Sequence, residues 1–130
     1  MSQTKTETEM FCWQCEQTAL GKGCSTFGVC GKSPEVAKMQ DLLIYGLRGL
    51  SQVVLEARKV GLKDPATDVF ISEALFATLT NVNFDPDSIA HYLNWTVEAR
   101  EALDPCRYLL RDAVVAGSIQ AKFPRRPGRL

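Results

Sequence analysis

Four pairs of a helix-capping residue followed by proline constrain this chain more than any other feature. The pairs are Ser33-Pro34, Asp64-Pro65, Asp85-Pro86 and Asp104-Pro105. A serine or aspartate at the N-cap accepts hydrogen bonds from free N–H groups of the first turn. Proline fits the first helical position because it has no N–H to leave unsatisfied and its φ is already helical. The four pairs therefore predict four helix starts.

Apolar side chains recur every three or four residues after each of these starts. From Pro34 to about Val60 the apolar stripe consists of Val36, Met39, Leu43, Leu47, Leu50, Val54 and Ala57. This spacing is typical of one helix face. The stripe is widened by Leu42, Ile44, Val53 and Val60, so we expect the helix to pack on more than one side. Similar patterns predict further helices over about residues 65–80, 86–103 and 105–116. Because the connections are short, we expect an all-α, up-and-down bundle of three to four helices, preceded by a cysteine-rich loop.

The composition is that of one soluble globular domain. The chain has 130 residues, of which 45% are hydrophobic and 23% charged. A chain of this length needs no disulfide or metal merely to hold a core together. Its formal net charge is zero, so no global attraction draws it to nucleic acid or to an anionic membrane. Because the polar segment 1–10 lacks the apolar core of a signal peptide and no apolar run could span a bilayer, we expect a cytoplasmic protein.

The chain divides into a polar tail (1–10), a single domain (11–121) and a basic, proline-containing tail (122–130). The domain begins with the cysteine loop, residues 11–32, which holds four of the five cysteines. Glycines in this loop predict tight turns rather than a long helix; they are Gly21, Gly23, Gly28 and Gly31. Gly61 and Gly117 fit helix stops. The basic tail is interpreted as solubilising rather than as a phosphate-binding segment.

The cysteines of the loop, Cys12, Cys15, Cys24 and Cys30, have the spacing C-x2-C-x8-C-x5-C. Clustered cysteines in a chain with no signal for an oxidising compartment indicate metal or redox chemistry rather than disulfides. Four cysteine thiolates are the usual ligands of iron–sulfur clusters. They also suit structural zinc, whose sites usually show two C-x2-C-like pairs. The spacing therefore favours an iron–sulfur cluster and leaves zinc open as an alternative.

Apolar side chains alternate with these cysteines, and we expect them to shield a cluster from water; they are Phe11, Trp13, Phe27 and Val29. Gln14, between the first two cysteines, is interpreted as a packing and hydrogen-bonding residue of the site. Glu16 and Lys32 flank the loop. The favoured interpretation of both is solvated charge, and the alternative is a role in tuning a reduction potential or docking a partner.

Two further residues could carry chemistry. Cys106 follows the proline of a predicted helix start, where the helix dipole can lower a thiol pKa. A small buried side chain is nevertheless the favoured interpretation. His91 is the only histidine, and we expect a partly exposed structural role for it on the third helix.

Several separated segments resemble the hybrid cluster proteins, once called prismanes. They are FCWQCEQT at 11–18, GVCGK at 28–32, QDLLIY at 40–45 and FATLTNVNF at 76–84. The resemblance spans about residues 10–100 and implies an α-helical N-terminal domain whose compact cysteine motif holds a [4Fe–4S] cluster. Carried over to this chain, the ligands are Cys12, Cys15, Cys24 and Cys30. A related form of the family, with wider spacing between the second and third cysteines, holds [2Fe–2S].

The length of this chain departs from that family. Members are several hundred residues longer, and their second centre, an iron–sulfur–oxygen hybrid cluster, takes its ligands from downstream domains. Their reduction of hydroxylamine and nitric oxide depends on that centre, so we do not expect this chain to perform it alone. The resemblance fades past about Leu103. We therefore expect a natural small protein that begins at Met1 and in which the Asp104–Leu130 segment is specific to a standalone form.

The leading hypothesis is an electron-transfer protein, or a subunit through which electrons enter a partner redox enzyme docked near the cysteine loop. Alternatives are an iron–sulfur sensor of redox state or nitric oxide, a subunit completing a hybrid-cluster-type enzyme, and a zinc-stabilised interaction module. The wide apolar surface of the first helix can pack within the monomer or against a second chain. The resemblance favours association, including a homodimer, because the equivalent domain of the family packs on further domains. Membrane and nucleic-acid partners are not expected.

Overall fold

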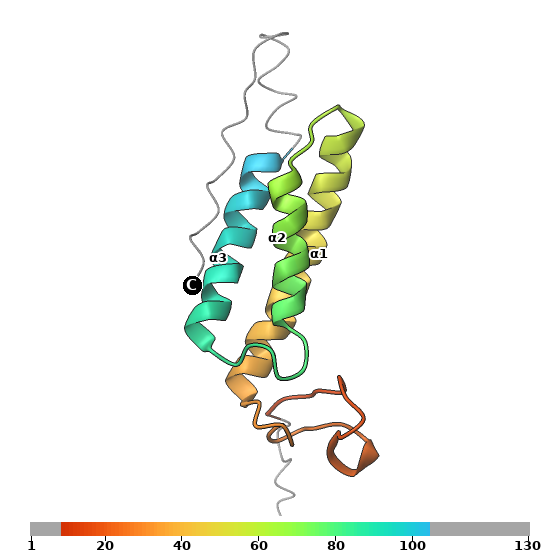
Figure 1. The fold of residues 1–130 in the computed structure, drawn as a ribbon, viewed down its shortest axis with the longest axis vertical. Helices are drawn as coiled ribbons and strands as arrows, with labels where there is room; N and C mark the ends of the chain where they lie inside the picture. The colour runs from red at the N-terminus through yellow and green to blue at the C-terminus, as the bar shows by residue number, and fades with distance from the viewer. Residues whose placement is uncertain (1–8, 105–130) are drawn as a thin grey trace, which may run out of the picture.

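The computed structural model describes residues 9–104, which contain three α-helices. They are α1 (Pro34–Lys59), α2 (Pro65–Ala77) and α3 (Pro86–Leu103). Figure 1 shows α1 leading away from the cysteine loop, α2 returning towards it and α3 leading away again. The predicted all-α, up-and-down architecture is therefore confirmed. The expected helix over 105–116, with Gly117, Cys106 and the basic tail, lies outside the described residues.

Each helix begins at a proline preceded by a side chain that caps its first turn. The caps, with the residues whose N–H groups they accept from, are Ser33 (Val36), Asp64 (Ala66 and Thr67) and Asp85 (Asp87). The structure thus confirms the helix starts predicted from these three pairs. At the fourth pair, Asp104 is the C-cap of α3, and Pro105 lies outside the part of the chain that the structure describes.

The end of α1 follows from Gly61. Its φ is +85°, a left-handed conformation that glycine adopts without steric cost. The Gly61 N–H donates to the Arg58 carbonyl at 3.1 Å, and the Leu62 N–H donates to the Ala57 carbonyl at 3.0 Å. These two bonds form the Schellman motif that closes many helices. The predicted stop at Gly61 is confirmed.

The end of α2 differs from the sequence prediction. The helix ends at Ala77 rather than near Thr80. Thr78 follows as the C-cap, and its Oγ1 donates to the Leu75 carbonyl at 2.7 Å. The chain then turns through Asn81, whose φ is +61°. A short asparagine side chain tolerates this conformation, which ends the helical path. Residues 78–85 therefore form a longer α2–α3 connection than expected.

The core lies between the three helices. Its buried apolar members are Val36, Leu43, Leu47, Leu50, Val54, Phe70, Ala74, Ile89, Trp95, Ala99 and Leu103. The rings of Phe70 and Trp95 pack with centroids 3.6 Å apart and planes at 51°. The predicted stripe of α1 faces this core, and Val53 widens it by packing against the core. Ile44 is partly buried, whereas Leu42 and Val60 are more than half exposed and do not widen the stripe. None of the helices within residues 9–104 is long and apolar enough to cross a membrane.

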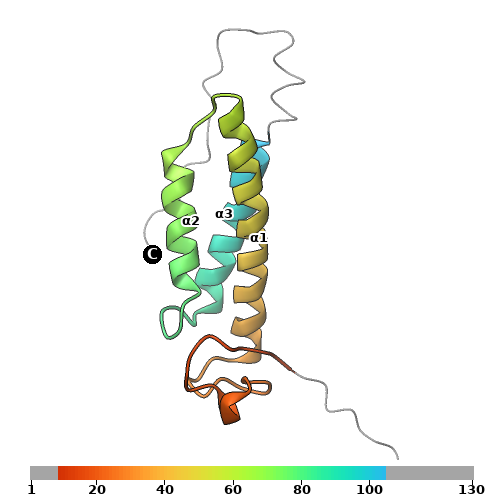
Figure 2. The same ribbon diagram turned by 90° about the vertical axis from the view of Figure 1, so that its right-hand side faces the viewer.

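The cysteine loop lies at one end of the bundle, next to the start of α1 and the α2–α3 connection (Figure 2). Met10, predicted to belong to the polar tail, is buried in a small cluster with Cys24 and Ala37. Its N–H donates to the Ser25 carbonyl at 3.1 Å. Within the described residues, the packing therefore includes Met10, and α1 anchors the loop through Ala37.

Candidate metal centre

A two-residue backbone bridge closes the cysteine loop. Cys12 and Cys24 pair in antiparallel fashion, and each donates its N–H to the carbonyl of the other at 2.9 Å. The Thr18 Oγ1 donates to the Cys12 carbonyl at 3.2 Å and so ties the intervening segment to the bridge. Two cysteines separated by eleven residues are thereby placed side by side.

A tight turn over residues 28–32 positions the last cysteine. The Gly28 N–H donates to the Lys32 carbonyl at 2.8 Å. A Cβ at position 28 would lie 2.9 Å from the Lys32 Cβ and 3.0 Å from its backbone nitrogen, so only glycine fits without a shift. Within the turn, Gly31 has a φ of +93°, which favours glycine. The turn holds Cys30 at its tip and returns the chain to the start of α1.

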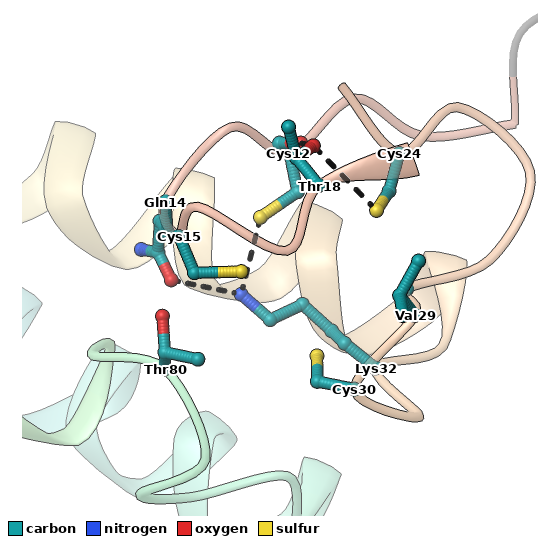
Figure 3. A pocket seen from close by; sticks show the side chains of 10 residues that line it. Cys12, Gln14, Cys15, Thr18, Cys24, Val29, Cys30, Lys32 and Thr80 are labelled. Carbon is teal, nitrogen blue, oxygen red and sulfur yellow. Dashed lines mark hydrogen bonds between the residues drawn. The ribbon is translucent and has the colours of Figure 1, made fainter. Parts of the chain in front are cut away.

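The four cysteines of the loop line one pocket. Their sulfur atoms lie around a common space in Figure 3. The pocket encloses about 310 Å³, including space open to solvent, and its other lining residues are Gln14, Thr18, Gly28, Val29, Lys32 and Thr80. Cys24 is buried, whereas Cys12, Cys15 and Cys30 are partly exposed. Although the four cysteines line one pocket, no three or more His, Cys, Asp or Glu side chains within residues 9–104 form a group that could hold a single metal ion.

The environment of Cys24 favours its thiolate. A backbone hydrogen bond from Val29, and a second from the Ala19 N–H at 3.5 Å, lower the pKa of Cys24 below its usual value. Burial opposes this shift, and the Thr18 hydroxyl and the Lys32 charge add to the lowering. The thiolate is the form of cysteine that binds metals. This buried cysteine is therefore prepared to act as a ligand.

Lys32 is buried in the same pocket. The residue is 3% exposed, and its Nζ lies within hydrogen-bonding distance of two groups of the loop. It donates to the Gln14 Oε1 at 3.1 Å and to the Cys12 Sγ at 3.7 Å. The ammonium also lies 5.8 Å from the centre of the Phe84 ring. The interpretation of Lys32 as a solvated charge is therefore wrong, because the turn at Gly28 directs the side chain inward.

The α2–α3 connection contributes to the pocket from the bundle side. The Gln14 Nε2 donates to the Thr78 carbonyl at 2.9 Å, which joins the loop to the end of α2. The buried Gln40 of α1 donates to the Asn83 carbonyl at 2.8 Å and fixes the same connection. Thr80 lines the pocket. The hydrogen-bonding role predicted for Gln14 is confirmed, while no local sequence signal indicated Thr80 or Thr18.

The apolar residues that alternate with the cysteines are mostly exposed, and among them Val29 lines the pocket. Phe11, Trp13, Phe27 and Val29 are 54–61% exposed. The predicted shielding is therefore wrong for Phe11, Trp13 and Phe27, which do not line the pocket, while Val29 lines it but leaves much of its surface in solvent. Glu16 and His91 are also exposed, as expected for a solvated charge and for a histidine outside the site.

Comparison with known protein families gives a match over most of this chain. The model of the prismane/CO dehydrogenase family matches residues 10–122. The chain belongs to this family. The match continues beyond Leu103, so the expectation that the family resemblance ends there is wrong. All four cysteines of the pocket lie within the matched region.

The relatives of this prismane-family chain include proteins named hydroxylamine reductase. The protein from Syntrophobacter fumaroxidans is 58% identical over 94 residues, which are 72% of this chain and 17% of that protein. The protein from Methanocella arvoryzae is 56% identical over 104 residues, 80% of this chain and 19% of that one. The protein from Trichormus variabilis is 47% identical over 115 residues, 88% of this chain and 21% of its own length. The chain thus spans about a fifth of the curated relatives it matches.

Proposed function

We propose that this chain holds a [4Fe–4S] cluster on Cys12, Cys15, Cys24 and Cys30 and passes single electrons to or from a redox partner. The observation that carries the proposal is the convergence of these four side chains on one pocket at the end of a helical bundle. Four cysteine thiolates are the usual donor set of such clusters. The compact spacing of the motif, which resembles the cubane form of the prismane family, supports [4Fe–4S] over [2Fe–2S].

The surrounding residues fit an anionic, sulfur-rich group. Hydrogen bonds from N–H groups and positive charges stabilise thiolate and sulfide, and they also set the reduction potential of a cluster. The Ala19 N–H and the Thr18 hydroxyl lie near the Cys24 sulfur, and the Lys32 ammonium lies near the Cys12 sulfur. The cluster supplies a reversible one-electron couple when bound. The bundle holds the loop in place through the Thr78 carbonyl, which accepts from Gln14, and through Ala37, which packs against Cys24.

The chain's size relative to the hydroxylamine reductases suggests its place in a larger reaction. It corresponds to about a fifth of their length. We propose that it supplies electrons to a separate catalytic centre, on another polypeptide or on further chain, rather than reducing hydroxylamine with the pocket described above. Within residues 9–104, the one charged side chain that lines the pocket beside the cysteines is Lys32.

The partner is expected to dock beside the cysteine loop. Phe11, Trp13, Phe27 and Val29 expose apolar surface there, and such surface marks interaction sites in soluble proteins. A redox protein with a complementary apolar surface would cover these side chains. Replacing Trp13 by serine is expected to slow electron transfer to that partner while leaving the cluster content unchanged.

A second function is supported by the exposure of the ligands. Cys12, Cys15 and Cys30 are only partly buried, so small molecules such as nitric oxide can reach a cluster held there. The chain would then act as a sensor whose partner binding changes when the cluster is modified. Nitric oxide titration with a binding assay distinguishes this from electron transfer, which requires no change in binding.

The first experiment is anaerobic purification followed by iron, sulfide and zinc analysis and EPR before and after reduction. About four irons and four sulfides per chain, with a new EPR signal on reduction, would support the proposal. Cys12→Ser is expected to lose the cluster. Cys106→Ser removes the cysteine that lies outside the motif and should retain it. Stoichiometric zinc without sulfide would replace the proposal by a zinc-stabilised interaction module.

A further inference from the structure

Lys32 stands out because a lysine ammonium is rarely buried without an opposite charge beside it. The residue is 3% exposed. The ion pairs that the structure describes within residues 9–104 join Arg58 to Asp68 and Lys59 to Glu56, and neither includes Lys32. Its hydrogen-bond partners are the neutral amide of Gln14 and the sulfur of Cys12. The anion that balances this buried cation must therefore come from the pocket itself.

The position of Lys32 in the chain gives no other reason for its charge. The residue directly precedes Ser33, the N-cap of α1. The N-terminal end of a helix carries a partial positive charge, so a cation there is unfavourable for the helix. The charge therefore weakens the start of α1 unless a nearby negative group offsets it. The four cysteines around the pocket provide such a group once they are deprotonated by metal binding.

We infer that Lys32 is the buried counter-charge of the cluster and raises its reduction potential, a role that rests on the proposed function. A cubane held by four thiolates carries a net negative charge, which grows by one on reduction. A fixed cation beside it stabilises the reduced state more than the oxidised state. Because Lys32 is buried, solvent and salt screen this interaction only weakly. The chain thereby favours the reduced cluster through a buried charge rather than through an exposed one.

Gln14 is the positioning residue for this charge. Its Oε1 accepts from the Lys32 ammonium at 3.1 Å, while its Nε2 donates to the Thr78 carbonyl at 2.9 Å. Both ends of the amide are used, so its orientation is fixed by the bundle. The Phe84 ring, 5.8 Å from the ammonium, closes the same side. The end of α2 thus holds the lysine against the cysteines through one amide.

The test is a redox titration of the cluster-loaded full chain, followed by EPR, in wild type and Lys32→Gln. We expect the ratio of reduced to oxidised cluster at a given potential to fall at least tenfold in Lys32→Gln. For a one-electron couple this is a shift of about 59 mV to more negative potential. Lys22→Gln is the matched control, because Lys22 is an exposed lysine of the same loop. It should change the ratio less than twofold.

Two further variants keep the inference open to refutation. Lys32→Arg retains the charge, so its ratio of reduced to oxidised cluster should stay within threefold of that of wild type. Gln14→Leu keeps the Lys32 charge but removes the amide that positions it. This variant should lower the ratio of reduced to oxidised cluster by less than Lys32→Gln does. A loaded Lys32→Gln protein with an unchanged potential would overturn the role of Lys32 while leaving the proposed function intact.

If Lys32→Gln loses the cluster, the potential of Lys32→Arg tests the inference instead. A cluster-loaded Lys32→Arg protein with a reduction potential near that of wild type supports the counter-charge. A large shift of that potential overturns it. Wild-type protein with iron and sulfide but no reversible couple would overturn both proposals.

Discussion

The helical bundle and the cysteine loop are stabilised by different means. In the bundle, Leu43, Leu47, Leu50 and Ile89 are at most 1% exposed, and apolar burial of this kind is the main favourable term in folding. In the loop, the large apolar side chains are mostly exposed and the order comes from a backbone bridge and glycine-dependent turns. From this difference we expect the bundle to fold on its own core and the loop to gain stability from the metal group proposed for it.

The largest expected effect comes from truncating the core of the bundle. Leu47 of α1 is 1% exposed, and Leu47→Ala leaves a cavity between the helices. We expect the free energy of unfolding to fall by about 2–5 kcal/mol in chemical denaturation. Leu42 lies on the same helix but is 56% exposed, so Leu42→Ala should change it by no more than about 0.5 kcal/mol. Equal losses in the two variants would contradict the core assignment.

The next largest effect is expected in the loop. Gly28→Ala places a Cβ 3.0 Å from the Lys32 backbone nitrogen, so the turn must open at a cost of about 1–3 kcal/mol. The expected result is faster loss of the cluster to a chelator, with little change in thermal unfolding of the helices followed by circular dichroism. Gly49→Ala on α1 is the control, because a Cβ added there would meet no atom within 4 Å. It should stabilise the bundle by about 0.5–1 kcal/mol.

A smaller effect is expected from removing one helix cap. The Asp64 carboxylate accepts from the Ala66 and Thr67 N–H groups at the start of α2. Asp64→Ala should lower the free energy of unfolding by about 1 kcal/mol and leave the reduction potential of the cluster unchanged. Lys63→Ala, an exposed change one residue earlier, is the control. A shift in potential that accompanies the loss of stability would show that the bundle and the loop are more tightly coupled than we propose.

The smallest effect on the bundle should follow removal of the cluster. Chelation under anaerobic conditions is expected to leave the helical circular dichroism almost unchanged, because no residue of the apolar core belongs to the cysteine pocket within residues 9–104. Limited proteolysis should then cut preferentially in the cysteine loop. Loss of helical signal on chelation would mean that metal binding and folding are linked in the whole domain, as in small zinc-dependent modules.

Local patterns in the sequence predicted much of this architecture. The capping residues at Ser33, Asp64 and Asp85 act within one turn of chain, so their effect on helix starts can be read from neighbouring residues. Gly61 ends α1 for the same local reason. The four cysteines lie within 19 residues, and their spacing indicated one shared site. The end of α2 was less predictable, because apolar residues continue past Ala77 while a turn at Asn81 competes with the helix.

The sequence by itself thus determined the helical class, the helix starts and the grouping of Cys12, Cys15, Cys24 and Cys30. Only the tertiary structure decided which neighbours surround these cysteines. The Gln14–Thr78 hydrogen bond joins positions 64 residues apart, and the burial of Lys32 depends on a turn and on the α2–α3 connection together. The physical reason is that burial and charge pairing depend on contacts between distant segments, which local periodicity and capping do not specify.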